Sequence, residues 1–166
     1  MNYHLIKYDD MNNGEGLRIT LFVSSCEHRC KNCHNPQTWD AKSGKLFDSF
    51  ALNEIYSQLS KDYISGLTLS GGDPLNKTNL KDIYSLCCSI KEHFPNKTIW
   101  LYTGYTYEEI LQDENKLKIL KLCDVLVDGK YVEELSDVNY KWAGSLNQKV
   151  VNIQKSLSEG RVIELE

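Results

Sequence analysis

The chain has 166 residues, of which 41% are hydrophobic, and a formal net charge of −4. This fits one globular domain, residues 1–166, and excludes the basic surface typical of proteins that bind nucleic acid or anionic membranes. No apolar run approaches the ~20 residues of a membrane span, and the first residues lack signal-peptide features. We therefore expect a cytoplasmic protein with no nucleic-acid or membrane partner, in which six cysteines favour metal or redox chemistry over disulfides.

Short apolar runs and amphipathic stretches alternate along the chain. The apolar runs predict four buried strands, at residues 19–23, 66–70, 98–102 and 124–128. The amphipathic stretches predict helices at 52–59 and 80–94, and the segment 106–109 has the pattern of a capping box. This alternation predicts an α/β fold with a mainly parallel sheet. Four units are about half of an eightfold barrel, so we expect an open, partial (β/α) barrel, with a loosely ordered tail after about residue 155.

Residues that carry chemistry follow each predicted strand. A cysteine-rich segment follows the first strand, and the later strands end at Gly71-Gly72-Asp73, Thr103-Gly104 and Asp128-Gly129. Binding sites of parallel α/β folds lie at the carboxyl ends of the strands. We therefore expect these segments to form one site.

Cys26, Cys30 and Cys33 form a C-x3-C-x2-C triplet. Three thiolates can hold a four-iron, four-sulfur cluster and leave one iron open to bind another molecule. The alternatives are a structural Cys3His zinc site completed by His28 or His34, a C-x-x-C-H haem-attachment string, an electron-transfer cluster and plain free thiols.

The triplet resembles the signature of the radical S-adenosylmethionine enzymes, and Gly71-Gly72-Asp73 resembles their Gly-Gly-Glu motif, with Asp in place of Glu. The resemblance implies two cofactors, a 4Fe-4S cluster and S-adenosyl-L-methionine. In that family the open iron chelates the amino and carboxylate groups of S-adenosylmethionine. One electron then cleaves the sulfonium, and the resulting 5′-deoxyadenosyl radical abstracts a hydrogen atom.

Further segments resemble the glycyl-radical-activating enzymes, and among them the activators of anaerobic ribonucleoside-triphosphate reductase. The matching segments are residues 13–18, 35–39, 100–105, 125–130 and 142–148. The resemblance implies that the substrate is a glycine of the large reductase subunit and that a low-potential donor such as a flavodoxin supplies the electron. The alternatives are an activator of another glycyl-radical enzyme, an enzyme that modifies a small molecule and a zinc-stabilised Cys3His interaction module.

The resemblance also assigns roles to individual residues. It makes Cys26, Cys30 and Cys33 the cluster ligands. It implies that the backbone of Asn32, Cys33 and His34 lies along the adenine, where His34 replaces a more common aromatic residue. It implies that Gly71, Gly72 and Asp73 face the methionine, and that Thr103 and Asp128 lie near the ribose or carboxylate.

Several other residues keep two interpretations. His28 either tunes the cluster by a hydrogen bond or faces solvent. Arg18 orients a loop, contacts a partner or forms a surface salt bridge. Trp39 and Trp142 belong to a partner surface or to the core. The remaining cysteines are expected to be packed thiols, because no second C-x2-C pair exists: Cys87, Cys88 and Cys123.

Overall fold

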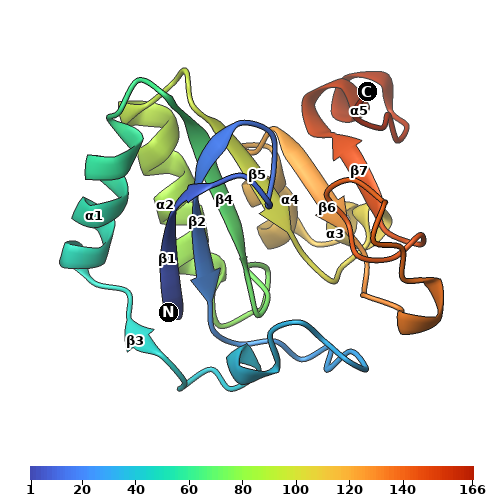
Figure 1. The fold of residues 1–166 in the computed structure, drawn as a ribbon. Helices are drawn as coiled ribbons and strands as arrows, with labels where there is room; N and C mark the ends of the chain where they lie inside the picture. Colours follow the sequence, from blue (N-terminus) through green and yellow to red (C-terminus); the bar gives the residue numbers. More distant parts are fainter.

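The computed structural model describes residues 1–166, which form one seven-stranded sheet with five α-helices (Figure 1). The strands are β1 Asn2–Asp10, β2 Leu17–Val23, β3 Lys45–Leu46, β4 Ile64–Gly71, β5 Thr98–Tyr102, β6 Val125–Asp128 and β7 Lys149–Asn152. The helices are α1 Ser49–Leu59, α2 Leu80–His93, α3 Tyr107–Leu111, α4 Glu114–Leu120 and α5 Ile153–Glu159, with short 3-10 turns at Pro36–Thr38 and Glu133–Leu135.

The sheet is mixed and open. Its strand order is β3-β1-β2-β4-β5-β6-β7. The four middle strands are parallel, as predicted, whereas β1, β3 and β7 are antiparallel to their neighbours. The predicted α/β class is confirmed, and the mainly parallel arrangement holds for the middle of the sheet only. The two outer strands do not meet, so no closed barrel forms.

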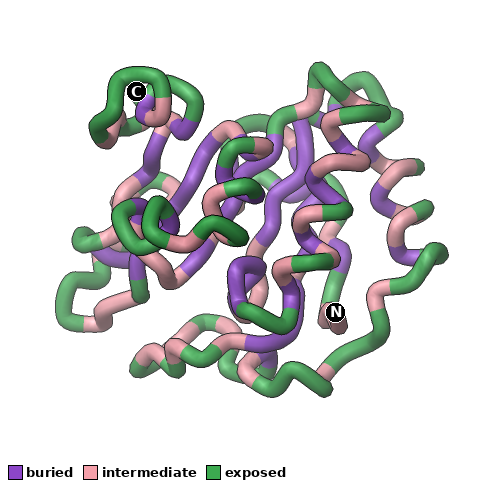
Figure 2. The backbone as a smooth tube through the Cα atoms, turned by 180° about the vertical axis from the view of Figure 1, so that it is seen from behind, coloured by how far each residue is buried: buried purple, intermediate pink, exposed green.

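One face of the sheet packs against the helices. The strand register aligns Leu21 of β2 with Leu69, Leu101 and Leu126 of the next three strands. All four side chains are fully buried and belong to a core cluster of 25 residues that also includes side chains from α1 to α5. Burial of each such leucine contributes about 1.5–3 kcal/mol. Figure 2 shows that the buried stretches follow the strands, while the connecting segments are largely exposed.

The strand residues between these leucines point to the other, concave face of the sheet. Arg18 of β2 is 1% exposed, and its guanidinium donates to the carbonyls of Leu67 and Thr98 at 3.0 and 2.9 Å and to the hydroxyl of Thr68 at 2.8 Å. It also lies over the Trp100 ring, 5.5 Å from the centroid. Arg18 therefore joins three parallel strands from within, and it is not a surface salt bridge.

The C-terminal residues return to the sheet. Gly160 ends α5 in a left-handed conformation, φ +70°, which glycine adopts without strain. The chain then hydrogen-bonds to β7 through Asn152 N to Ile163 O and Leu165 N to Val150 O, both 2.8 Å. None of the helices combines the length and the apolar character needed to cross a bilayer.

Candidate functional site

The cysteine segment begins at the end of β2, where the residue before α2 and the turn at Pro36–Thr38 hold it. Asn79, which precedes α2, donates to the Ser24 carbonyl at 2.8 Å. Ser25 N donates to Thr38 O at 2.6 Å, and Cys26 N donates to Trp39 O at 3.2 Å. These bonds fix the position at which the first cysteine leaves the sheet.

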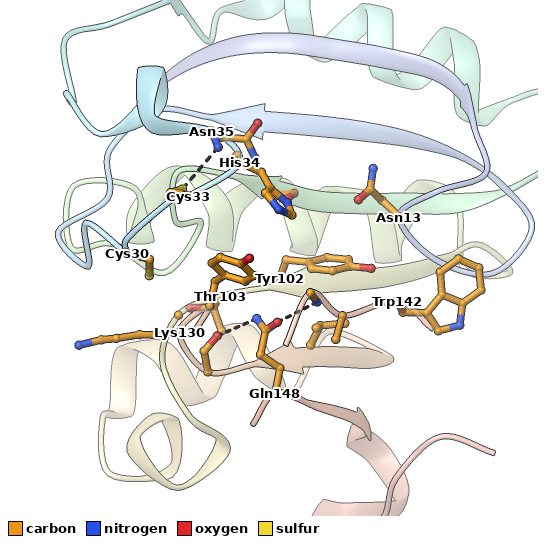
Figure 3. Close-up of a pocket in the computed structure, with 18 of the residues that line it drawn as sticks. Asn13, Cys30, Cys33, His34, Asn35, Tyr102, Thr103, Lys130, Trp142 and Gln148 are labelled. Atoms are coloured by element: carbon orange, nitrogen blue, oxygen red, sulfur yellow. Dashed lines mark hydrogen bonds between the residues drawn. The ribbon is translucent and has the colours of Figure 1, made fainter. Parts of the chain in front are cut away.

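All three thiols of the triplet face one cavity of about 720 Å³. Figure 3 shows Cys30 and Cys33 at one end of this cavity, with Trp142 at the other end and Tyr102 between them. Arg29 and Asn32 adopt left-handed conformations, φ +48° and +54°, so the backbone reverses tightly between the cysteines. Cys33 Sγ also accepts from Asn35 N at 3.4 Å. A volume of this size is typical of small-molecule and cofactor sites.

The spacing of the donor atoms suits a cluster better than a single zinc ion. A tetrahedral zinc bound by thiolates holds its sulfurs about 3.8 Å apart. The ligand atoms that gather within 4.8 Å of one another belong to Cys26, His28 and Asp73, and not to the three cysteines. The three cysteines instead line one cavity, and three thiolates around a shared space can ligate a four-iron cluster. The residues present therefore fit a 4Fe-4S cluster.

Two thiols of the triplet have raised pKa values. Burial raises the pKa of Cys26 to about 11, although backbone N–H groups of His28 and Arg29 partly oppose the shift. Burial also raises the pKa of Cys30, opposed by the N–H of Tyr131. Both thiols are therefore protonated at neutral pH before a metal binds, and binding has to displace their protons.

Gly71 and Gly72 let the end of β4 lie directly against the start of the cysteine segment. Gly71 has φ +107°, and a Cβ there would lie 2.3 Å from Val23 N; a Cβ on Gly72 would lie 2.7 Å from Ser25 O. Because neither residue has a side chain, the two segments approach closely enough for Gly72 N to donate to Val23 O at 2.8 Å. Both glycines line the cavity, so the pair serves the packing of two strand ends as well as the cavity wall.

The Asp73 side chain points into the protein, and it does not line the cavity. It is 1% exposed and accepts four hydrogen bonds. One carboxylate oxygen accepts from Leu75 N at 2.9 Å and Thr103 Oγ1 at 2.7 Å. The other accepts from Gly104 N at 3.0 Å and lies 2.7 Å from His28 Nε2. Asp73 thus joins the ends of β4 and β5 to the cysteine segment.

The other expected site residues fall into two groups. His34 and Thr103 line the cavity, and the His34 ring lies 5.1 Å from that of Tyr131. Asn32 is exposed and its side chain donates to Glu133. Asp128 accepts from Tyr107 N at 2.7 Å and Lys149 N at 2.9 Å, and its side chain is outside the cavity lining. The structure therefore does not bring the Asn32 and Asp128 side chains to the cavity.

The His28 side chain hydrogen-bonds Asp73 rather than a sulfur, and it does not face solvent. It is 5% exposed and its ring packs 4.6 Å from that of Tyr105. Trp39 lies under Arg29, and Trp142 packs edge-on against Trp100 with 5.5 Å between the ring centroids. Cys87 and Cys123 are buried in the helix-side core, as expected for packed thiols.

Beyond the cysteines, the cavity wall contains residues that the motifs did not single out as a site. Tyr102 lines the cavity, and its buried hydroxyl has no hydrogen-bond partner. Gln148 accepts from Gly144 N at 2.9 Å and donates to Gly129 O at 2.9 Å, and so joins two loops of the cavity wall. The signal for Tyr102 was present in the alternation of β5, which places Trp100 and Tyr102 on the same face.

Comparisons with known proteins show the family to which the chain belongs. A family model described as a 4Fe-4S single cluster domain matches residues 12–151. The anaerobic ribonucleoside-triphosphate reductase-activating protein of Enterobacteria phage T4 is 47% identical over 150 residues, which cover 90% of this chain and 93% of the relative. The chain belongs to this family of activating proteins.

Bacterial members of the family show the same extent of similarity. The proteins of that name from Vibrio cholerae and Escherichia coli K12 are 43% and 41% identical, over 90% and 93% of this chain and 97% and 100% of their own lengths. The resemblance inferred from the motifs is therefore confirmed, and the 4Fe-4S domain covers the cysteine triplet and the strand ends around it.

Proposed function

We propose that this chain is a radical S-adenosylmethionine enzyme that abstracts a hydrogen atom from a glycine of the large subunit of anaerobic ribonucleoside-triphosphate reductase. The observation that carries the proposal is the meeting of three thiols and two strand-end glycines at one cavity in a chain of this family. The open sheet is consistent with a partial barrel of the radical S-adenosylmethionine type.

The cavity residues suggest how the cofactors are held. Cys26, Cys30 and Cys33 would ligate a 4Fe-4S cluster. S-adenosylmethionine would lie between the glycines of β4 and the His34 end of the cysteine segment. When bound, this pair of groups supplies a reductively generated 5′-deoxyadenosyl radical that abstracts hydrogen.

The other expected site residues would orient the ligands, either directly or through the backbone. His34 and Tyr131 present adjacent rings at the cysteine end, which suits stacking with an adenine. Asn32, Asp73 and Asp128 would act through the backbone that they hold, because their side chains do not line the cavity. Thr103 lines the cavity, but its hydroxyl already donates a hydrogen bond to Asp73. It would therefore contact a ligand through its methyl group and the neighbouring backbone.

A polypeptide substrate is consistent with the open end of the sheet. The cavity extends from the cysteines to Trp142, and its lining includes the fully exposed Val138. A backbone loop of the reductase subunit would enter there. The electron would come from a low-potential donor of the flavodoxin type, and the reaction would take place in the cytoplasm, where the thiols stay reduced.

The test uses the full chain, purified and reconstituted without oxygen. We expect about four irons per chain, and release of 5′-deoxyadenosine and methionine after addition of dithionite and S-adenosylmethionine. Adding the large reductase subunit should then produce a glycyl radical in the electron paramagnetic resonance spectrum. A colourless zinc protein, or a radical formed only on a different glycyl-radical enzyme, would contradict the proposal.

Matched cysteine variants provide the control. Cys30→Ala should abolish cofactor cleavage, because it removes one cluster ligand. Cys88→Ala should retain it, because Cys88 lies on α2 and outside the cavity lining. Full cleavage by the Cys30→Ala protein would refute the ligand assignment.

A further inference from the structure

The carboxylate of Asp73 lies close to the cavity, but both of its oxygens already accept hydrogen bonds from the protein. No ligand is needed to satisfy it. Backbone N–H groups of Leu75 and Gly104, the Thr103 hydroxyl and the His28 ring occupy both oxygens, at 2.7 to 3.0 Å. A buried carboxylate with this many donors is held in a single orientation.

The His28 ring is also held rigidly. It lies against Tyr105 and directly over Gly104, where an added Cβ would come within 2.4 Å of the ring. The absence of a side chain at Gly104 therefore makes room for this ring. His28 is part of the cysteine segment, so the contact with Asp73 anchors that segment between Cys26 and Cys30 to the ends of β4 and β5.

The pair lies beside a proposed cluster ligand. The ligand atoms of Cys26, His28 and Asp73 all lie within 4.8 Å of one another. One-electron reduction makes a cluster more negative. A fixed carboxylate at this distance, in a site shielded from water, disfavours that change, and the effect is stronger than it would be in solvent.

We propose that Asp73, held by His28, is a positioning residue that fixes Cys26 and lowers the reduction potential of the cluster. The inference rests on the proposed function, because it assumes the cluster. The step is the uptake of one electron from an external low-potential donor by the oxidised cluster, with no bond made or broken in the protein. A lower potential makes the reduced cluster a stronger reductant, which suits cleavage of a sulfonium.

The experiment compares two buried carboxylates in the full reconstituted protein. Asp73→Asn keeps the size of the side chain and removes its charge. Asp10→Asn is the matched control, because Asp10 is also 1% exposed and also accepts several hydrogen bonds. Asp10 pairs with Arg18 at the far end of β2, roughly 16 Å of strand from the cysteine segment at ~3.3 Å per residue.

The readout is the midpoint potential of the cluster, measured by titration with dithionite and redox mediators and followed by electron paramagnetic resonance. We expect Asp73→Asn to favour reduction at least tenfold, a rise of about 59 mV for one electron, and Asp10→Asn to leave the potential unchanged. Equal potentials in wild type and Asp73→Asn, or equal shifts in both variants, would overturn the inference.

His28 variants test the anchoring role and apply even if Asp73→Asn does not fold. His28→Ala should lower the iron bound per chain after reconstitution, and His28→Gln should restore it, because an amide can still donate to Asp73. Full iron binding by His28→Ala would contradict the anchoring role. These failures differ from failure of the proposed function, in which the wild-type protein itself would bind no four-iron cluster or cleave no S-adenosylmethionine.

Discussion

The two faces of the sheet are stabilised in different ways. The helix side is apolar and close-packed, and adjacent strands contribute aligned leucines. The concave side contains the buried Arg18 and Asp10 and an aromatic cluster around Trp100. Apolar packing is tolerant of small changes in shape, whereas buried polar groups depend on particular partners. The comparison teaches that the face with the site is also the face where single contacts matter most.

Arg18 should give the largest effect on stability. Arg18→Met would leave the carbonyls of Leu67 and Thr98 without these donors, and each such loss costs about 1–3 kcal/mol. We expect the free energy of unfolding to fall by about 4 kcal/mol, measured by urea denaturation. Arg18→Lys should recover little, because one ammonium cannot span both strands. A loss below about 1 kcal/mol would mean that the concave face does not depend on this residue.

Substitutions at two adjacent residues of β2 test the two faces independently. Leu21→Ala removes a fully buried side chain from the helix side, so stability should fall by about 3 kcal/mol while cofactor cleavage per folded molecule is unchanged. Phe22 lines the cavity and is partly exposed. Phe22→Ala should cost less stability and reduce cleavage more. The reverse pattern, in denaturation and single-turnover assays, would show that the faces are not functionally distinct.

The buried carboxyl of Asp10 should make the stability of the protein depend on pH. Burial alone would raise its pKa, but hydrogen bonds from Asn13, Thr20 and the Asn12 backbone outweigh burial and lower it. A carboxyl with a lowered folded-state pKa stabilises the protein above its unfolded pKa of about 4, and the contribution disappears as the pH falls through the folded value. Asp10→Asn should cost about 2 kcal/mol at neutral pH, and less on acidification.

Tyr102 should give the smallest effect on stability. Burial is the main reason that its pKa is raised well above the usual value, and Asp10 adds to the shift. Because its hydroxyl has no partner, Tyr102→Phe should change the free energy of unfolding by less than about 0.5 kcal/mol or stabilise slightly. Glycyl-radical formation should fall if the hydroxyl contacts the incoming backbone. A clear destabilisation would show that the hydroxyl is hydrogen-bonded in the folded protein.

The elements with strong local patterns were predictable. The apolar runs predicted the four middle strands, and the capping box at Thr106 and Glu109 is present as expected. Strands β1 and β7 were not predicted. The exposed positions of β1 and the short length of β7 give weak patterns, and their pairing is decided by tertiary contacts.

The site was predictable to the level of segments but not of side-chain directions. The positions of Cys26, Cys30 and Cys33 at one cavity follow from their place after a parallel strand. The inward direction of the Asp73 and Asp128 side chains could not be predicted. It depends on hydrogen-bond donors that lie 21 to 45 residues away in the sequence. Sequence spacing contains no information about those distant donors.

The hydrogen bonds of Gln148 affect the entropic cost of binding a partner. Its side chain already fastens the loops at Gly129 and Gly144 to each other. This wall of the cavity therefore loses little conformational entropy when a partner arrives, and only the incoming segment has to become ordered. A preformed wall therefore lowers the entropic cost of binding a partner at this end of the cavity.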